Sequence, residues 1–431
     1  MPEVPARSST QRARFGRIAT NVTAAALVFW LTALNVRLHF PGRRDTAIAQ
    51  LAHLSSVLHQ GAADQMQSWF PEGYVFTWAL YGLASAQVAE ALPTSDARRA
   101  VALRGARESV EHVLSEQGRS TFVEDMDPPY GAFYASWSLY LRSVVLRASR
   151  PGDPLPFDMD EYSRDCGRLA AALERSPTPF LHSYPGQAWP ADTGVGVAAL
   201  AICDAVLGVR YRPILSRWVR EVRLRRDPRT GAIPHAANAA DGSPRDGPRG
   251  ESLALLSRVL VDVDSSLARE QYTILRESFV DYAWGWPGVR VFPRGVNGHG
   301  DVDSGPVVLG FGGPATVVGA GAALANGDPR LGTTLLAVAE VVGFPIEFAG
   351  RRWYGGGIAP VGDAFLAWAR STPPTAREAG YGRVVPRGWM LPIHAGSTLV
   401  LLLLIRRLMR AGRKHSRGPQ LPARPEPRPD R

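Results

Sequence analysis

The chain contains a single lysine, Lys414, among its 431 residues, so arginine supplies nearly all of its positive charge. The formal net charge is +10. The excess lies at the two ends, in residues 1–17 and 406–431, and the sequence between them is close to neutral. Proteins that bind nucleic acid carry their basic residues as a patch or stripe on a folded surface. We therefore expect no nucleic-acid partner.

Cysteine is also scarce. Cys166 and Cys203 each fall within a predicted helix, where we interpret them as small buried hydrophobic side chains. A disulfide between them stays open, because the sequence does not show whether they approach each other. The chain has no Cys-x-x-Cys pair, no Cys/His spacing typical of zinc, no Gly-x-Ser-x-Gly turn, no P-loop and no His-Glu-x-x-His helix. We expect neither a cofactor nor a metal.

Two long segments lack charge altogether. One lies between Arg17 and Arg37, and the other is the leucine-rich segment 388–405. A helix of about 20 apolar residues spans the hydrocarbon core of a bilayer. We therefore predict transmembrane helices over 18–37 and 388–405, with the lipid bilayer as a partner.

Basic residues flank both segments on the side away from the middle of the chain. The positive-inside rule places the basic tails, 1–17 and the disordered 406–431, in the cytoplasm. Residues 38–385 then form one extracytoplasmic domain at the cell membrane, and both termini are cytoplasmic. A cleaved signal peptide is the alternative for the first segment, because alanine-rich segments can end at a cleavage site.

Helical periodicity accounts for most of the sequence between these segments, and no comparable run of alternating β-branched residues occurs. The predicted helices are 45–59, 72–92, 96–116, 131–149, 159–174, 192–208, 211–225, 250–262, 265–280, 305–326, 329–343 and 358–371. Helices 192–208 and 305–326 are almost free of charge, so we expect them to be buried on all sides. Helices 96–116, 211–225 and 265–280 carry many Arg and Glu residues and should each have one wet face.

Short links join these helices in pairs, and long loops separate the pairs. An inner ring of apolar helices inside an outer ring of amphipathic helices accounts for both observations. We therefore predict an all-α fold, an (α/α)6 toroid of about twelve helices. Its long loops gather on one face, and N- and C-terminal transmembrane helices flank it.

This alternation of inner and outer helices resembles the (α/α)6 toroid of six-hairpin glycosidases and related sugar-active enzymes. The segment 226–235 contains an Asp-Pro-Arg-Thr-Gly turn and resembles the hairpin that such proteins often insert before an inner helix. The loop 184–192, Tyr-Pro-Gly-Gln-Ala-Trp-Pro-Ala-Asp, is similar to one in the linalool dehydratase-isomerase-like proteins, which share the toroid and can be extracytoplasmic. The resemblance covers residues 45–371 and implies a sugar-active enzyme or a dehydratase-isomerase.

Acidic residues stand in the long loops, in front of apolar helices. Asp192 suits an N-cap, and it equally suits a carboxylate at the mouth of the ring, near the positive end of a helix. Asp301 and Asp303 follow His299, and two close carboxylates push each other's pKa values apart, as an acid and a base require. Solvated loop acids, or calcium ligands together with His299, are the alternatives.

We predict Asp192 and Asp303 as the catalytic carboxylates. Asp127 also suits a rigid turn at Pro128, and Glu251 also suits an ordinary first helical turn. The predicted substrate-binding residues are Tyr74, Asp127, Tyr130, Tyr184, Trp189, Glu251, His299, Asp301 and Tyr354.

The expected function is acid/base glycoside cleavage by a membrane-anchored extracytoplasmic enzyme whose ligand is a carbohydrate or another hydroxylated small molecule. One alternative is a linalool dehydratase-isomerase-like hydro-lyase or isomerase with Tyr and Asp as acid and base. The other is an envelope glycan-binding protein without catalysis.

Overall fold

The computed structural model describes residues 9–208, 210–283, 285–301, 303–373, 381 and 387–416, and most of these are helical. The chain divides into two compact units. The central unit is Pro41–Pro386, and the terminal unit combines Met1–Phe40 with Arg387–Arg431. The end of the predicted C-terminal tail, residues 417–431, lies outside the described residues.

The terminal unit consists of two long helices that pack against each other, α1 (Ser9–His39) and α16 (Leu391–Ser416), with a short 3₁₀ helix, η4 (Arg387–Met390), before α16. Asn35 Nδ2 donates a hydrogen bond to Ser397 Oγ at 2.9 Å. A polar pair of this kind between two apolar helices fixes their register.

Both helices are long and apolar enough to cross a membrane, over Ile18–His39 and Gly388–Arg410. Their apolar side chains point outward; Phe29, for example, is 78% exposed. Apolar surface left in water costs about 25 cal/mol per Å², so these surfaces favour lipid, and we infer membrane association. The helix α16 continues beyond the predicted boundary at residue 405 as far as Ser416.

The central unit contains most of the helices. They are α2 (Arg44–Leu58), α3 (Ala62–Trp69), α4 (Gly73–Ala91), α5 (Ala97–Leu114), α6 (Glu116–Arg119), α7 (Gly131–Ala148), α8 (Met159–Arg175), α9 (Pro190–Leu207), α10 (Arg212–Leu224), α11 (Gly250–Val259), α12 (Ser265–Ile274), α13 (Gly313–Ala325), α14 (Pro329–Val342) and α15 (Pro360–Ser371). Single turns η1 (Leu260–Asp262), η2 (Leu275–Phe279) and η3 (Gly355–Gly357) extend or link them.

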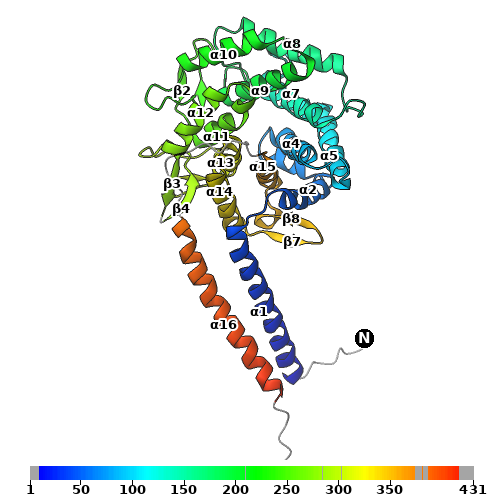
Figure 1. Cartoon of the computed structure of the whole chain (residues 1–431), viewed down its shortest axis with the longest axis vertical. Coiled ribbons are helices and arrows are strands. Elements are labelled where there is room, and N and C mark those ends of the chain that lie inside the picture. Colours follow the sequence, from blue (N-terminus) through cyan, green and yellow to red (C-terminus); the bar gives the residue numbers. More distant parts are fainter. Residues whose placement is uncertain are drawn as a thin grey trace, which may run out of the picture. The chain divides into compact units, whose positions relative to one another are not determined.

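Six of these helices contact one another in a closed cycle: α4 contacts α7, α7 contacts α9, α9 contacts α11, α11 contacts α13, α13 contacts α15, and α15 contacts α4. Other helices pack against members of the cycle, as α5 does against α4, α12 against α11, α14 against α13 and α2 against α15 (Figure 1). Every long loop that precedes a cycle helix therefore leads into the same group of packed helices.

The composition of each helix explains its place. The helix α9 is also long and apolar enough for a membrane span, but 78% of that stretch is buried within the central unit, so it is a core helix. Small residues let neighbouring helices approach closely: a Cβ at Gly196 would lie 2.4 Å from Ser136 Oγ of α7. In contrast, α8 and α10 bury one apolar face and expose arginines on the other.

Strands are few and short in the part of the chain that the structure describes. They form four antiparallel hairpins: β1 (Ala236–Ala237) with β2 (Pro244–Asp246), β3 (Val280–Ala283) with β4 (Trp286–Val289), β5 (Val307–Val308) with β6 (Phe311–Gly312), and β7 (Ile346–Phe348) with β8 (Arg351–Trp353).

One hairpin corrects the prediction of a helix over 305–326. The helix α13 begins only at Gly313, and the hairpin β5–β6 occupies the residues before it. The turn of that hairpin needs left-handed backbone at Leu309 (φ 55°) and Gly310 (φ 84°), which ends any helix there. Pro314 then starts the helix, where its missing N–H is not needed.

Candidate functional site

Asp192 lies in the first turn of α9, in the position that contacts the preceding loop. The N-cap of α9 is Trp189, so Asp192 is not the N-cap residue that the sequence suggested. Its side chain instead reaches back along the chain, where Ser183 Oγ donates a hydrogen bond to Asp192 Oδ2 at 2.6 Å. Asp192 is buried, with 8% of its surface exposed. The loop and the helix start together hold one carboxyl group in place.

The surroundings of Asp192 favour its protonated form. Burial raises its pKa from 3.8 to about 7, and the charges of Asp303 and Glu72 add to the rise. The hydrogen bond from Ser183 opposes it, as does the nearby indole of Trp137 to a smaller extent. The Trp137 nitrogen is buried and has no hydrogen-bond partner among the described residues. A carboxyl group with a pKa near 7 can both give and take a proton at neutral pH.

Asp303 lies at the solvent side of the same region. Its side chain is exposed, and nearby protein atoms desolvate one part of the carboxyl group. This desolvation, followed by the charges of Asp301 and Glu72, raises its pKa from 3.8 to about 6, and Arg249 opposes the rise. Asp303 therefore ionises more readily than Asp192, although each carries a raised pKa.

Asp301 is tied to the protein more firmly than Asp303. Its carboxylate accepts from Arg249, which also binds Asp246 Oδ2 at 2.6 Å. Its second oxygen accepts the backbone N–H of Ser304 at 3.0 Å. These contacts occupy both oxygens of Asp301, so the structure gives it the role of positioning Arg249 and the loop rather than of a free acid.

His235 lies beside Asp301, with Nε2 3.9 Å from Asp301 Oδ2. Its other ring nitrogen, Nδ1, is 2.6 Å from Ser252 Oγ. Burial, and then the charge of Arg249, lower the pKa of His235 to about 4. The imidazole is therefore neutral at physiological pH.

Glu251 is the most unusual acid of the group. It lies in the first turn of α11, is 7% exposed, and neither carboxylate oxygen has a hydrogen-bond partner. Burial raises its pKa to about 8, and the charges of Asp301 and Asp303 add to the rise. An unpartnered buried polar group costs about 1–3 kcal/mol. A ligand that bonds to Glu251 would remove that cost.

Tyr184 forms a hydrogen bond with a further acidic residue, Glu72. Its hydroxyl donates a hydrogen bond to Oε1 of Glu72, the residue just before α4. Burial raises the pKa of Tyr184, and the charges of Asp192 and Glu72 add to the rise, so the phenol stays protonated. The sequence offered a weak signal for Glu72, because it stands in a Trp-Phe-Pro-Glu-Gly loop before an apolar helix. It was not among the predicted site residues, and neither was Ser183.

Aromatic rings surround Tyr184. Trp189 meets it edge-on with ring centroids 5.4 Å apart, and Phe122 and Phe133 stack on it at 6.4 and 6.2 Å. Phe133 belongs to α7, whereas Phe122 and Trp189 belong to loops. Tyr184, which binds Glu72, is therefore packed within a cluster of aromatic rings. We call Glu72, Asp192, Glu251, Asp301 and Asp303 together the acid group.

Other predicted site residues make their contacts elsewhere. The Tyr74 hydroxyl lies 2.8 Å from Nδ1 of His112 on α5. Asp127 pairs with Arg175 of α8 at 2.8 Å. Tyr354 donates to Glu340 of α14 at 2.7 Å.

The two remaining predicted residues also lie apart from the acid group's contacts. Tyr130, with φ 65°, packs edge-on against Tyr134, and His299 lies exposed in the loop before Asp301. None of the five residues Tyr74, Asp127, Tyr130, His299 and Tyr354 forms a hydrogen bond or ion pair with the acid group in the part of the chain that the structure describes.

Comparison with known proteins leaves the family of this chain open. No protein-family model matches it, and no curated protein is significantly similar to it. Among the described residues, no three His, Cys, Asp or Glu side chains are grouped so as to hold a metal ion. The acid group itself is therefore the basis for any functional conclusion.

Proposed function

We propose that this protein is a membrane-anchored extracytoplasmic enzyme that cleaves glycosidic bonds with the carboxyl groups of Asp192 and Asp303. The closed cycle of six helices with its outer partners supports an (α/α)6 toroid as the scaffold. The observation that carries the proposal is that the charge of Asp303 acts on the buried carboxyl group of Asp192, although the two residues come from loops far apart in sequence, and that their pKa values are raised to about 6 and about 7.

The two raised pKa values divide the roles between the two acids. At pH values between the two, Asp303 is the more ionised of the pair and Asp192 the more protonated. Asp192 then donates its proton to the glycosidic oxygen as the bond from that oxygen to the anomeric carbon breaks. Asp303 takes a proton from the water molecule whose oxygen bonds to the same carbon. Separations of about 6.5–9.5 Å between the two carboxyl groups suit this inverting route, and about 5–5.5 Å suits direct attack by Asp303.

The other members of the acid group suit a hydroxylated ligand. Protonated Glu251 offers one donor and one acceptor that no protein group uses. Ring faces such as that of Trp189 stack on the apolar faces of sugars. Asp301 holds Arg249 beside Asp303, which favours the charged form of the base.

A second candidate rests on the same aromatic rings. Phe122 and Phe133 stack on Tyr184, and an apolar surrounding of this kind suits the hydrocarbon part of a terpenoid-like alcohol. A hydro-lyase or isomerase would use the Tyr184 hydroxyl and Asp192 as acid and base. Glycoside cleavage is favoured because the acid group contains five carboxyl groups, more than the dehydration of a single alcohol needs.

The test is hydrolysis of a panel of glycans by the full chain in detergent micelles, compared with Asp303→Asn. Loss of the general base should lower kcat by roughly 10²–10⁴-fold. Asp241→Asn is the matched control, because Asp241 is an exposed acid outside the acid group. Equal activity of wild type and Asp303→Asn would refute the role of Asp303. Release of water from an apolar alcohol, without glycan cleavage, would favour the second candidate.

A further inference from the structure

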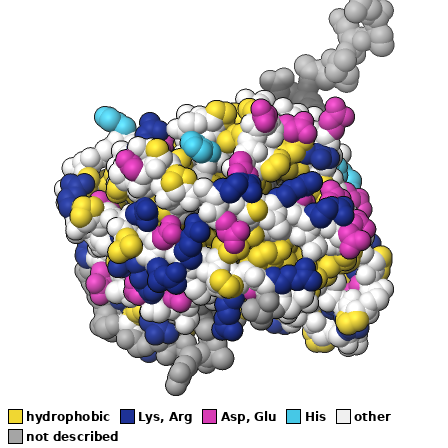
Figure 2. Space-filling view, turned by 90° about the horizontal axis from the view of Figure 1, so that it is seen from above, with side chains coloured by type: hydrophobic (Ala, Val, Ile, Leu, Met, Phe, Trp, Pro, Cys, Tyr) yellow, Lys and Arg dark blue, Asp and Glu magenta, His cyan; other side chains and the backbone are white. Residues whose placement is uncertain are grey.

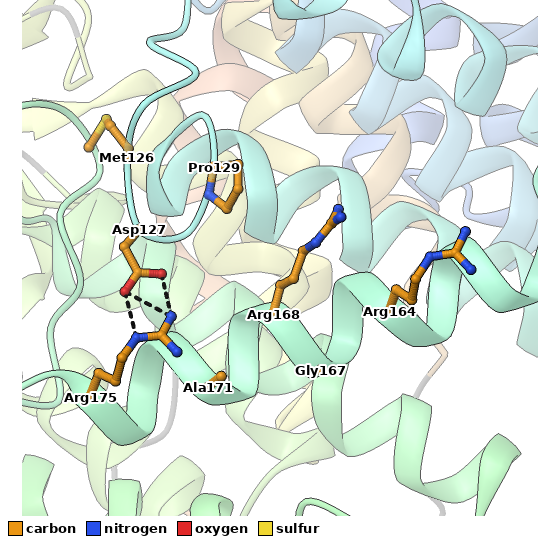
Figure 3. Close-up of a pocket in the computed structure, with 8 residues that line it drawn as sticks. All are labelled: Met126, Asp127, Pro129, Arg164, Gly167, Arg168, Ala171 and Arg175. Atoms are coloured by element: carbon orange, nitrogen blue, oxygen red, sulfur yellow. Dashed lines mark hydrogen bonds and ion pairs between the residues drawn. The ribbon is translucent and has the colours of Figure 1, made fainter.

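A hollow separate from the acid group lies between α8 and the loop that precedes α7. Its volume is about 490 Å³. The residues that line it are Met126, Asp127, Pro129, Arg164, Gly167, Arg168, Ala171 and Arg175 (Figure 3). We call it the α8 arginine pocket. Three of its eight lining residues are arginines, and one is acidic.

The arginines share one face of α8 because of their spacing. Arg164, Arg168, Ala171 and Arg175 are four, three and four residues apart, which places them in one stripe along a helix. Arg175 reaches toward Asp127 of the loop, and Arg164 and Arg168 extend from the same side of α8 (Figure 3). The small residues Gly167 and Ala171 between them leave the space that forms the pocket.

The pocket has more positive charge than its protein partners neutralise. Arg175 makes a two-pronged contact with Asp127, at 3.1 and 2.8 Å. Arg168 bonds to Asp165 at 3.0 Å. Arg164 forms no ion pair within the described residues. Like charges four residues apart destabilise a helix, so an anion placed between Arg164 and Arg168 would relieve their repulsion.

The contact between Asp127 and Arg175 shows which ligand chemistry the pocket accepts. The planar guanidinium fork matches the two oxygens of a carboxylate, and it matches phosphate and sulfate equally well. The face seen in Figure 2 carries basic and acidic side chains interspersed. Attraction of an anion to this pocket is therefore assigned to its own arginines, because this face carries no uniform basic charge.

The pocket is linked directly to the loop that holds Asp192. Its wall continues from Pro129 to Gly131, where a Cβ would lie 2.2 Å from the carbonyl oxygen of Ser183. The next residue, Ala132, donates its N–H to His182 at 2.8 Å. Ser183 in turn bonds to Asp192. The loop that carries Met126, Asp127 and Pro129 is therefore packed against the segment that holds the Asp192 side chain in place.

We propose that the α8 arginine pocket binds an anionic substituent of the saccharide ligand, so that the substrate class is an acidic glycan. The carboxylate of a uronic acid, a sulfate ester or a phosphate ester would bind to Arg164 and Arg168, while the adjoining sugar units reach the acid group. This inference rests on the proposed glycosidase function.

The test uses the full chain in micelles and measures binding of oligogalacturonate, with a neutral cello-oligosaccharide of equal length as comparison. The variant is Arg164→Gln/Arg168→Gln. The control is Arg104→Gln/Arg330→Gln, which removes the same charge from exposed arginines on α5 and α14 outside the pocket. The pocket variant should bind the acidic oligomer about tenfold more weakly for each arginine removed. Binding of the neutral oligomer, and all binding by the control, should stay unchanged.

Three outcomes would overturn the inference. One is an equal loss in the pocket variant and the control, which indicates only long-range charge attraction. Another is equal affinity of wild type for the acidic and neutral oligomers. The third is displacement of the oligomer by an equimolar amount of inorganic phosphate, which assigns the pocket to a free anion. Arginine-dependent binding without cleavage of any glycan would support this inference and contradict only the proposed function.

Discussion

Replacing Glu251 by glutamine should stabilise the protein, and the gain should grow with pH. Glu251 is 7% exposed and its carboxylate oxygens have no hydrogen-bond partners, so the substitution breaks no bond. It removes the ability to ionise and replaces the protonated carboxyl group by an amide of nearly the same size. Burial raises the pKa of Glu251 from 4.5 to about 8, which means that the folded state holds this proton more tightly than the unfolded state.

The sign and size of the effect follow from that pKa difference. Below pH 4.5 both states are protonated and the group contributes nothing. As pH rises from 4.5 toward 8, only the unfolded state releases the proton, so folding loses about 1.4 kcal/mol per pH unit. The loss for wild type is therefore below about 1 kcal/mol at pH 5, roughly 3 kcal/mol at pH 7 and roughly 5 kcal/mol above pH 8. Glu251→Gln avoids it.

Thermal unfolding of the full chain in micelles, recorded from pH 5 to pH 8, measures this difference. For a unit of about 350 residues, an unfolding entropy of about 2.1 cal/mol/K per residue converts 3 kcal/mol into about 4 °C in Tm. The variant should melt about 4 °C above wild type at pH 7 and about 1 °C above it at pH 5. Glu111→Gln, at an exposed position on α5, is the control. A difference independent of pH, or a less stable variant at pH 8, would refute the reasoning.

Three further predictions concern individual side chains. Tyr184→Phe removes the hydrogen bond to Glu72 and should lower kcat with Tm nearly unchanged, because the ring keeps its aromatic neighbours; an unaltered kcat would contradict a role in the site. Glu340→Gln leaves the buried Arg352 and Arg370 without their shared carboxylate, so it should lower the free energy of unfolding by about 3–5 kcal/mol, measured as a fall in Tm. Glu347 is a half-exposed partner of Arg352, and Glu347→Gln should cost under about 1 kcal/mol. Iodoacetamide should label the two cysteines only after unfolding, because both are buried free thiols; labelling of the native protein, seen by mass spectrometry, would contradict this.

Much of the helical architecture was readable from the sequence, because each helix carries its own pattern. The charge-free run of α9 predicted a buried helix, and the alternation of apolar and arginine-rich positions in α10 predicted a helix with one wet face. The prediction of a helix over 305–326 was wrong at its start, where apolar composition favours a helix and the turn residues favour a hairpin. Residues 305–312 are as apolar as the helix that follows them, but the turn at Leu309 and Gly310 makes them a hairpin.

The candidate site was less predictable, because its members come from distant loops. The sequence suits Asp192 equally to a helix cap and to a site carboxylate, because the hydrogen bond from Ser183 forms only in the folded loop. Glu72 and Tyr184 are 112 residues apart, and nothing local indicates that they pair. The carboxylate oxygens of Glu251 lack hydrogen-bond partners because of how the rest of the chain packs around α11. The pattern of residues within one helix does not reveal that packing.

The separate roles of Asp192 and Asp303 are the central claim, and the leaving group of the substrate tests them most directly. The measurement is kcat/KM for Asp192→Asn and Asp303→Asn on a natural glycan and on an aryl glycoside whose phenol leaves without protonation. Loss of a general acid matters only where the leaving oxygen needs a proton. Asp192→Asn should lose roughly 10²–10⁴-fold on the glycan and far less on the aryl glycoside, while Asp303→Asn should lose similarly on both. Equal losses by Asp192→Asn on both substrates, or full activity of either variant, would contradict the account.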